Sequence, residues 1–401
     1  MKMSVITGEY ALPKTERIIF RPGAVRNLRQ CVEALGGTRV LLITGRTLAR
    51  ETDIPARVAE ALAPILVEIV SGTRAHVPLQ TVFDIAARVR EVGADVLVSL
   101  GGGSPIDTAK AVAAVLAEGI EAPEDLDRLT VKFTFPNRLE VPRLAGRPIP
   151  HVAIPTTLSA AEFTGIVGVT DTERGFKKVI IDPALTPKIA ILDPELSLAT
   201  PMWLWTSSAI RSVDHAVEAF FSPRHHPITD ALAFAALETL FVGLPACRER
   251  PDDLAVRGHL QLAAGMAVWA LLGAGSGLSH GIGYVLGARF GVPHGISSCV
   301  TLPHVMRFNR PVARERAADM ARRLGWAMGD ADEDSAAAAV ERVLTDFIAS
   351  LGHPTRLREV GIRETDLPAL AGEVMKYPNV VNNVRPVADR EELLAFLRTA
   401  W

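Results

Sequence analysis

Short apolar runs alternate with amphipathic segments through the first half of the chain. The apolar runs predict strands at residues 17–20, 40–44, 65–70, 96–100, 151–154 and 188–192. Segments with helical spacing of apolar residues lie between them, at residues 24–35, 54–62, 78–92 and 105–117. Strands that alternate with helices in this way predict an α/β fold with a doubly wound parallel sheet.

The pattern changes near Pro194, and the second half is Ala- and Leu-rich and helical. It predicts helices at residues 207–221, 227–242, 253–272, 312–328 and 334–351. We therefore expect an α/β domain over residues 1–197 and an all-α domain over residues 198–401, with a cleft between them. Ligands of such proteins bind at the carboxyl ends of parallel strands and at domain interfaces.

Two smaller features interrupt the first half. The segment 121–147 is rich in proline, charge and aromatic residues, which is typical of an insertion or loop. Residues 163–169 and 176–181 flank a polar turn and predict a β-hairpin.

A glycine-rich loop follows the predicted strand at residues 96–100. It consists of Gly101, Gly102, Gly103 and Ser104, and Pro105 then suits the first turn of a helix. Glycines let a backbone approach a bulky anion, and the open amides of a helix start stabilise negative charge. The loop therefore predicts a site for the pyrophosphate of a dinucleotide. Taken alone, the motif also fits a tight strand-to-helix turn without a ligand.

Composition excludes several other classes of function. The net charge is −2, so no global field attracts nucleic acid or an anionic membrane. The three cysteines are far apart and include no C-x-x-C pair, which favours a reducing cytoplasm over a disulfide or thiolate-metal framework. No long apolar segment precedes the first charges, and the apolar run at residues 260–278 fits a buried core helix better than a membrane span.

Motifs spread along the chain carry a family resemblance. They are GGGSPIDTAKAVA at 101–113, AIPTT at 153–157, ILDPEL at 191–196, HAVEA at 215–219, PHG at 293–295 and LPHVMRFN at 302–309. Together, in this order, they resemble the iron-containing (group III) alcohol dehydrogenase family, which includes the maleylacetate reductases. The resemblance implies a nicotinamide cofactor, a small-molecule carbonyl or alcohol substrate and a homodimer.

Two stretches resemble the maleylacetate reductase branch in particular. One is RAHVP at residues 74–78, and the other is LSAAEFT at residues 158–164, one residue shorter than the A-G-T-G-S-E-V-T of typical iron alcohol dehydrogenases. Tyr284 departs from this branch, in which a histidine is usual at this position. The resemblance therefore does not assign the substrate of the maleylacetate reductases to this chain.

The resemblance also names the residues of the cofactor site. Thr156 and Thr157 would contact the dinucleotide, although strand-end hydroxyls also cap local backbone. Asp107, Leu196 and a hairpin lysine, for which we choose Lys178 over Lys177, would join them. Of these two lysines we expect one to face solvent. Asp107 and Lys110 lie three residues apart on the predicted helix, which favours a surface ion pair.

The choice between NADH and NADPH depends on Gly45 and Arg46. Many relatives carry an Asp in place of Gly45, where it accepts the ribose 2′-hydroxyl and repels a 2′-phosphate. Here a glycine is followed by an arginine, which can pair with a phosphate. We therefore favour NADPH slightly over NADH.

The metal site of the family departs from its usual pattern in this chain. Relatives hold the metal with three histidines and an Asp one helical turn before the first. Here the histidines are His215, His280 and His294, but Arg211 takes the place of the acid. Asp214 is adjacent to His215, so we expect it to point about 100° away from it. Three imidazoles can hold zinc or iron, but a guanidinium among them repels a cation, so we disfavour a metal.

These residues predict reduction of a carbonyl substrate that carries a carboxylate. Arg211, His215, His280 and His294 would bind the substrate or polarise its carbonyl, and Tyr284 or a histidine would give the proton. Tyr284 could equally be a core residue. The alternatives are a metal-dependent alcohol dehydrogenase that uses His215, His280 and His294, a lyase-type synthase like the related dehydroquinate synthases, and a non-catalytic relative.

Overall fold

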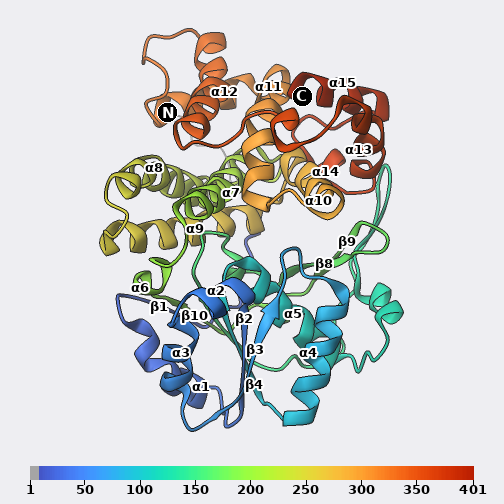
Figure 1. Ribbon diagram of the computed structural model, residues 1–401. Helices are drawn as coiled ribbons and strands as arrows, with labels where there is room; N and C mark the ends of the chain where they lie inside the picture. Colours follow the sequence, from blue (N-terminus) through green and yellow to red (C-terminus); the bar gives the residue numbers. More distant parts are fainter. Residues whose placement is uncertain (1–8) are drawn as a thin grey trace.

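The computed structural model describes residues 9–401, and its first half contains one six-stranded parallel sheet (Figure 1). The strands are β1 (Arg17–Phe20), β2 (Val40–Gly45), β3 (Leu66–Thr73), β4 (Val96–Gly101), β7 (His151–Pro155) and β10 (Ile189–Leu192). They lie in the order β1-β10-β7-β4-β2-β3, and every neighbouring pair is parallel. All six predicted strands and the doubly wound sheet are confirmed.

Helices cover both faces of this sheet because side chains of a strand alternate between its faces. Val40 and Leu42 pack with one set of helices, and Leu41 and Ile43 pack with the other. The first set is η1 (Ala24–Asn27), α1 (Leu28–Ala34) and α3 (Ile54–Leu62), and the second is α4 (Leu79–Val92) and α5 (Gly103–Ala117). The short helix α2 (Arg46–Glu51) was not predicted.

The two irregular segments of the first half contain small elements of their own. The predicted hairpin is confirmed as the antiparallel pair β8 (Ile166–Asp171) and β9 (Phe176–Ile181). The segment 121–147 contains η2 (Pro123–Leu129) and a second antiparallel pair, β5 (Lys132–Thr134) and β6 (Arg138–Glu140). Two short turns, η3 (Ala161–Phe163) and η4 (Pro183–Leu185), flank the hairpin β8–β9.

The second half is helical throughout the described residues. Its elements are α6 (Pro194–Ser197), α7 (Met202–Phe221), α8 (Pro227–Glu249), α9 (Leu254–Ala274), α10 (Leu278–Phe290), α11 (His294–Arg323), α12 (Glu333–Ser350), η5 (Leu357–Val360), η6 (Glu364–Asp366), α13 (Leu367–Val374), α14 (Asn379–Asn382) and α15 (Arg390–Ala400). Helix α7 is buried along most of its length and packs against α8, α9 and α11. The predicted helix at 312–328 is only the second part of α11, which passes through Pro303 and Pro311 and kinks at Ala313.

Two helices, α8 and α9, are long and apolar enough to cross a membrane by length and composition alone. Helix α9 instead packs against α7 and α8, and Leu260, Ala263 and Ala267 lie in the core. This packing agrees with the predicted core helix at residues 260–278.

The carboxyl ends of the parallel strands meet the helical half at one edge of the sheet. The loop after β7 contacts α7 there: Ser208 Oγ receives a hydrogen bond from the Leu158 amide at 3.0 Å, and Ser212 Oγ donates to the Leu158 carbonyl at 2.6 Å. The loop that follows β7 therefore lies against α7.

Lys110 on α5 forms hydrogen bonds with η3 and with the first residue of β8. Its side chain is fully buried, and Nζ donates to the carbonyls of Ala161 at 3.0 Å and Ile166 at 2.7 Å. Nζ also lies 2.7 Å from the Asp107 carboxylate. The prediction of a surface ion pair is therefore wrong, because backbone carbonyls of a neighbouring segment replace water around the ammonium.

Glu162 on η3 is 2% exposed, and its Oε2 has no hydrogen-bond partner among the described residues. Burial raises the pKa of this carboxyl to about 7. In the unfolded chain the carboxyl loses its proton near its ordinary pKa of 4.5. Between pH 4.5 and about pH 7 the folded protein therefore keeps a proton on Glu162 that the unfolded chain has lost. The free energy of unfolding decreases as the pH rises through this range.

We predict that Glu162→Gln raises the melting temperature by a few degrees at pH 8 and changes it little at pH 5. A raised pKa of this size corresponds to roughly 3 kcal/mol at high pH. Thermal unfolding of the wild type and the variant at both pH values measures the effect. The exposed Glu173→Gln is the control, and an equal shift at both pH values would contradict the interpretation.

Candidate active site

The glycine loop lies at the start of α5 with open backbone amides. Strand β4 ends at Gly101, whose φ of +136° requires a glycine, and α5 begins at Gly103 with no side chain capping it. Gly102, Gly103 and Ser104 are half-buried. Uncapped amides at the N-terminus of a 15-residue helix fit a pyrophosphate, which they would bind together with the positive end of the helix dipole.

The loop after β7 packs directly against the glycine loop. The Thr156 amide donates to the Gly101 carbonyl at 2.9 Å. A Cβ on Gly102 would lie 3.1 Å from Thr157 Cγ2, so a side chain at this position would push the two loops apart. The structure thus brings the predicted residues Gly101 to Ser104 together with Thr156 and Thr157.

The other predicted cofactor residues differ in how they are placed. Gly45 ends β2 at the same edge, and a Cβ there would meet nothing closer than 3.8 Å. Arg46 is exposed on the first turn of α2. Asp107 is half-buried and faces Lys110, whereas Leu196 is fully buried in the core of the sheet.

The two hairpin lysines are both buried, so the expectation that one faces solvent is wrong. Lys178 binds the carboxylate of Asp127 and lies 3.9 Å from that of Asp171. Lys177 points the other way, and its Nζ donates to His294 Nε2 at 2.6 Å. Successive residues of a strand face opposite sides, and it is Lys177 rather than the chosen Lys178 that reaches the histidines.

The five predicted catalytic residues come from three helices. Arg211 and His215 lie one turn apart on α7, His280 and Tyr284 lie one turn apart on α10, and His294 begins α11. The rings of His215 and His280 are 5.1 Å apart between centroids. Tyr284 is half-buried, with its ring 6.0 Å from Lys177 Nζ.

Arg211 has a carboxylate partner, Asp214, which the sequence analysis considered only as a neighbour of His215. Its Nη1 lies 3.4 Å from Asp214 Oδ2 and donates to Ser298 Oγ at 3.1 Å. Asp214 Oδ2 also accepts from Ser279 Oγ at 2.9 Å and from Ser298 Oγ at 2.6 Å. Residues three apart share a helix face, so Asp214 points toward Arg211 even though it points away from His215.

Glu218 is a further site residue, which the sequence interpretation considered only as an alternative ion-pair partner of Arg211. It accepts from the amides of Gly277 and Ser279, each at 2.7 Å, and from His280 Nδ1 at 2.6 Å. The carboxylate thus caps α10 and fixes the ring of His280, leaving its buried Nε2 without a partner among the described residues. Glu218 lies seven residues after Arg211, on the same face of α7, and this spacing was the available signal.

Burial and two cations set the protonation states of the cluster. Burial lowers the pKa of His280 to about 3, and burial also holds the pKa of His215 well below its ordinary value. Lys177 is the main cause of the low pKa of His294. Arg211 lowers the pKa of all three histidines. Burial lowers the pKa of Lys177 itself to about 8. The site therefore combines neutral imidazoles with fixed positive charge.

These donors do not fit a divalent metal. Ligand atoms of Asp214, Glu218 and His280 lie within 4.8 Å of one another, which is close enough to surround an ion. However, Asp214 Oδ2 and both oxygens of Glu218 already accept hydrogen bonds from serines, backbone amides and His280 Nδ1. The Arg211 guanidinium lies against the same carboxylate of Asp214, and it cannot lose its charge.

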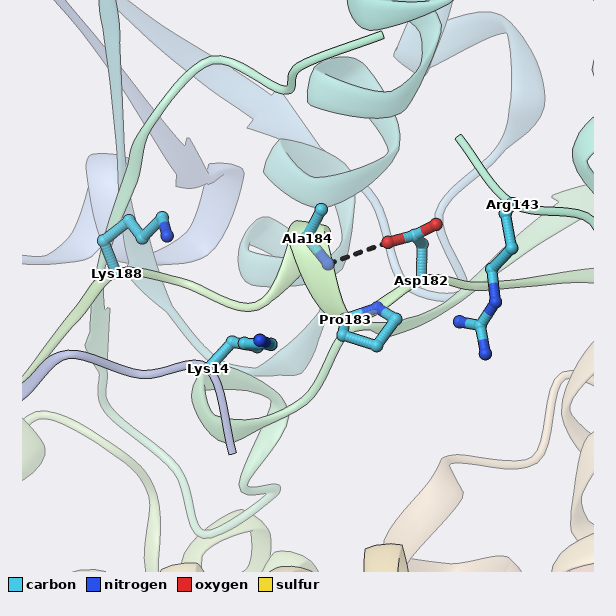
Figure 2. Close-up of a pocket in the computed structure, with 6 residues that line it drawn as sticks. All are labelled: Lys14, Arg143, Asp182, Pro183, Ala184 and Lys188. Carbon is cyan, nitrogen blue, oxygen red and sulfur yellow. Dashed lines mark hydrogen bonds between the residues drawn. The ribbon is translucent and has the colours of Figure 1, made fainter. Parts of the chain in front are cut away.

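A surface pocket lies elsewhere, before the amino end of β10 (Figure 2). It is lined by Lys14, Arg143, Asp182, Pro183, Ala184 and Lys188. Asp182 accepts from the Ala184 amide at 2.8 Å, and Lys188 binds Glu16 at 2.9 Å. This pocket is separate from the histidine cluster and contains none of the predicted site residues.

Comparisons with known proteins agree with the motifs. The family model "Iron-containing alcohol dehydrogenase" matches residues 15–194, and "Fe-containing alcohol dehydrogenase family, C-terminal" matches residues 207–401. The lactaldehyde reductase of Escherichia coli K12 is 32% identical over 95% of this chain and 97% of its own. Maleylacetate reductase 1 of Rhodococcus opacus is 31% identical over 96% and 94%. A solved 1,3-propanediol oxidoreductase has a TM-score of 0.86 and 27% identity, covering 99% of this chain and 100% of its own.

Proposed function

Because the chain belongs to the iron-containing alcohol dehydrogenase family, and is thus an NAD-dependent oxidoreductase, we propose a specific reaction for it. It reduces the carbonyl group of a small anionic substrate by hydride transfer, with NADPH slightly preferred over NADH and without a divalent metal. The homodimer and the cytoplasmic location also stay predictions.

One observation carries the proposal: a buried guanidinium occupies the histidine cluster. Arg211 is 8% exposed, and its charge lowers the pKa of His215, His280 and His294. A metal ion would supply positive charge to a carbonyl oxygen in this family. Here a fixed cation is already present, and a guanidinium holds a carboxylate by two parallel hydrogen bonds.

Residues from both the α/β half and the helical half would take part in such a reaction. The bound nicotinamide supplies the hydride. The amides of Gly103 and Ser104 at the start of α5 would hold its pyrophosphate. Arg211 would bind the substrate carboxylate or stabilise the oxygen that becomes negative, which is the role of a preorganised donor. Tyr284 or a histidine would give that oxygen its proton, and Lys177 adds a third donor near His294.

The relatives support the assignment as a reductase. Two of them are named maleylacetate reductase and lactaldehyde reductase. A maleylacetate carries carboxylates, whereas lactaldehyde is neutral, so the names leave the charge of the substrate open. Arg211 favours the anionic class, since a partly dry cationic site attracts anions.

We predict that Arg211→Ala raises the KM for an oxo-acid substrate by on the order of 100-fold, and that Arg211→Lys has a smaller effect. If Arg211 instead stabilises the forming alkoxide, kcat falls as well. Steady-state NADPH oxidation with a panel of oxo-acids and neutral aldehydes measures both parameters. Arg257→Ala is the control, because this buried arginine on α9 donates to backbone and Ser197 oxygens and lies over the Trp205 ring. Full activity of Arg211→Ala, or a clear preference for neutral aldehydes, would refute the assignment.

We predict that the purified protein holds far less than one iron or zinc ion per chain, even after incubation with either ion. A missing anionic ligand and an added cation both disfavour binding. Elemental analysis and activity after chelation test this. Arg211→Asp should then raise metal affinity relative to Arg211→Asn, if the three histidines converge on one ion. Close to one ion per chain, with activity lost on chelation and restored by metal, would overturn the metal-free mechanism.

We predict that the wild type binds NADPH more tightly than NADH. Gly45→Asp should weaken NADPH binding by on the order of 1–3 kcal/mol, because a carboxylate would repel the 2′-phosphate. Fluorescence titration of both cofactors measures the dissociation constants, with the uncharged Gly45→Asn as the matched control. Equal or tighter binding of NADH by the wild type would disprove the preference for NADPH. Binding of neither cofactor would contradict the proposed nicotinamide-dependent reaction.

A further inference from the structure

The loop between β3 and α4 has an unusual backbone. His76 and Val77 are consecutive non-glycine residues with positive φ, at +64° and +53°. Only Ala160 shares this feature among the non-glycine residues that the structure describes. Side chains disfavour the left-handed region, and a β-branched valine disfavours it most. Strain of this kind persists only where the surrounding structure enforces it, and it clusters at functional sites.

The hairpin β8–β9 holds the strained loop in place through one residue. Thr170 Oγ1 donates to the His76 carbonyl at 2.6 Å, and the Thr170 amide donates to the Val77 carbonyl at 2.8 Å. The Val77 side chain is 2% exposed and packs in the core beside α4 and α5. These contacts fix the two carbonyls and the valine, so the direction of the His76 side chain is also fixed.

The strained loop places the His76 side chain against the helical half of the molecule. Its ring lies edge-on to that of His294, with centroids 5.5 Å apart and planes at 67°. Helix α10 has a glycine at this point, and a Cβ on Gly287 would lie 3.2 Å from two His76 ring atoms and 3.4 Å from His294 Cε1. The absence of a side chain at Gly287 thus provides the space in which the two rings meet.

The ring of His294 depends on this contact for its orientation. Its Nε2 accepts the hydrogen bond from Lys177, but its buried Nδ1 has no partner within residues 9–401. One hydrogen bond leaves an imidazole free to tilt, and the edge of His76 restricts this motion. Any tilt of His294 would move the ammonium group of Lys177 with it.

We propose that His76 is a positioning residue for the reaction. The strained loop carries it from the nucleotide-binding half to the helical half, where it holds the His294–Lys177 pair toward the substrate carbonyl. This inference rests on the proposed function, since the pair acts on substrate only if the chain is a carbonyl reductase. Errors of about 1 Å in a reacting group can cost on the order of 100-fold in rate.

The first test replaces His76 by glycine, which removes both the imidazole and the strain at this residue. We expect kcat to fall by on the order of 10- to 100-fold with little change in the KM for substrate, while the melting temperature stays the same or rises. His76→Asn should recover part of kcat, because asparagine tolerates positive φ and keeps a polar group. An unchanged kcat in His76→Gly, or a kcat loss that only tracks a lower melting temperature, would overturn the proposal.

A second variant reaches the same pair from the opposite side. Gly287→Ala would press on both rings without changing a residue of the strained loop, so it should lower kcat in the same way. Gly258→Ala on α9 is the matched control, because a Cβ there meets nothing within 4 Å. Normal kcat in Gly287→Ala would contradict the positioning role.

A structural measurement separates this inference from the proposed function. In a crystal structure of His76→Gly we expect the His294 ring to tilt from its wild-type orientation and the Lys177 ammonium group to move with it, whatever the enzyme reduces. An unchanged His294–Lys177 pair would disprove the positioning role even in an active reductase. Absence of reductase activity in the wild type would disprove the proposed function, and the geometric claim would still be decided by that crystal structure.

Discussion

The ion pair between Arg211 and Asp214 on α7 determines the chemistry of the whole site. Arg211 keeps its charge at any useful pH, and it lies within a few ångströms of a carboxylate that is itself fully buried. Burying one charge alone would be strongly unfavourable, and the opposite charge together with hydrogen bonds from Ser279 and Ser298 to Asp214 Oδ2 makes the pair tolerable. Burial keeps the imidazoles of His215 and His280 neutral, Lys177 does so for His294, and the charge of Arg211 adds to both effects.

This arrangement exists only where the two halves of the molecule meet. The helical half supplies the guanidinium, the histidines and Glu218, whereas the sheet half supplies Lys177 through its hairpin and His76 through its strained loop. The uncapped start of α5 lies at the same edge of the sheet. A hydride carrier bound at that edge would therefore face a set of fixed cations and neutral donors, which suits a carbonyl that gains negative charge as it is reduced.

Local patterns in the sequence predicted the sheet and the glycine loop because burial on both faces produces continuous apolar runs. The three histidines were found through their motifs. Tertiary contacts decided the rest. Lys110 is buried because backbone carbonyls of another segment accept hydrogen bonds from its ammonium group, and no local sequence pattern indicates this. The choice between Lys177 and Lys178 depended on which face of the hairpin meets α10. Asp214 and Glu218 did have a signal in the sequence, since their spacing from Arg211 places both on the same face of α7 as Arg211.

The most direct test of the account is the equilibrium binding of an unreactive carboxylate to the cofactor-loaded protein. Succinate has no carbonyl that hydride can reduce, so isothermal titration measures recognition of the anion without turnover. The account predicts that succinate binds the NADPH-saturated wild type, and that Arg211→Gln weakens this binding by on the order of 100-fold. Equal affinity in the two proteins, or no binding by the wild type, would show that Arg211 does not serve as the substrate-binding cation of the site.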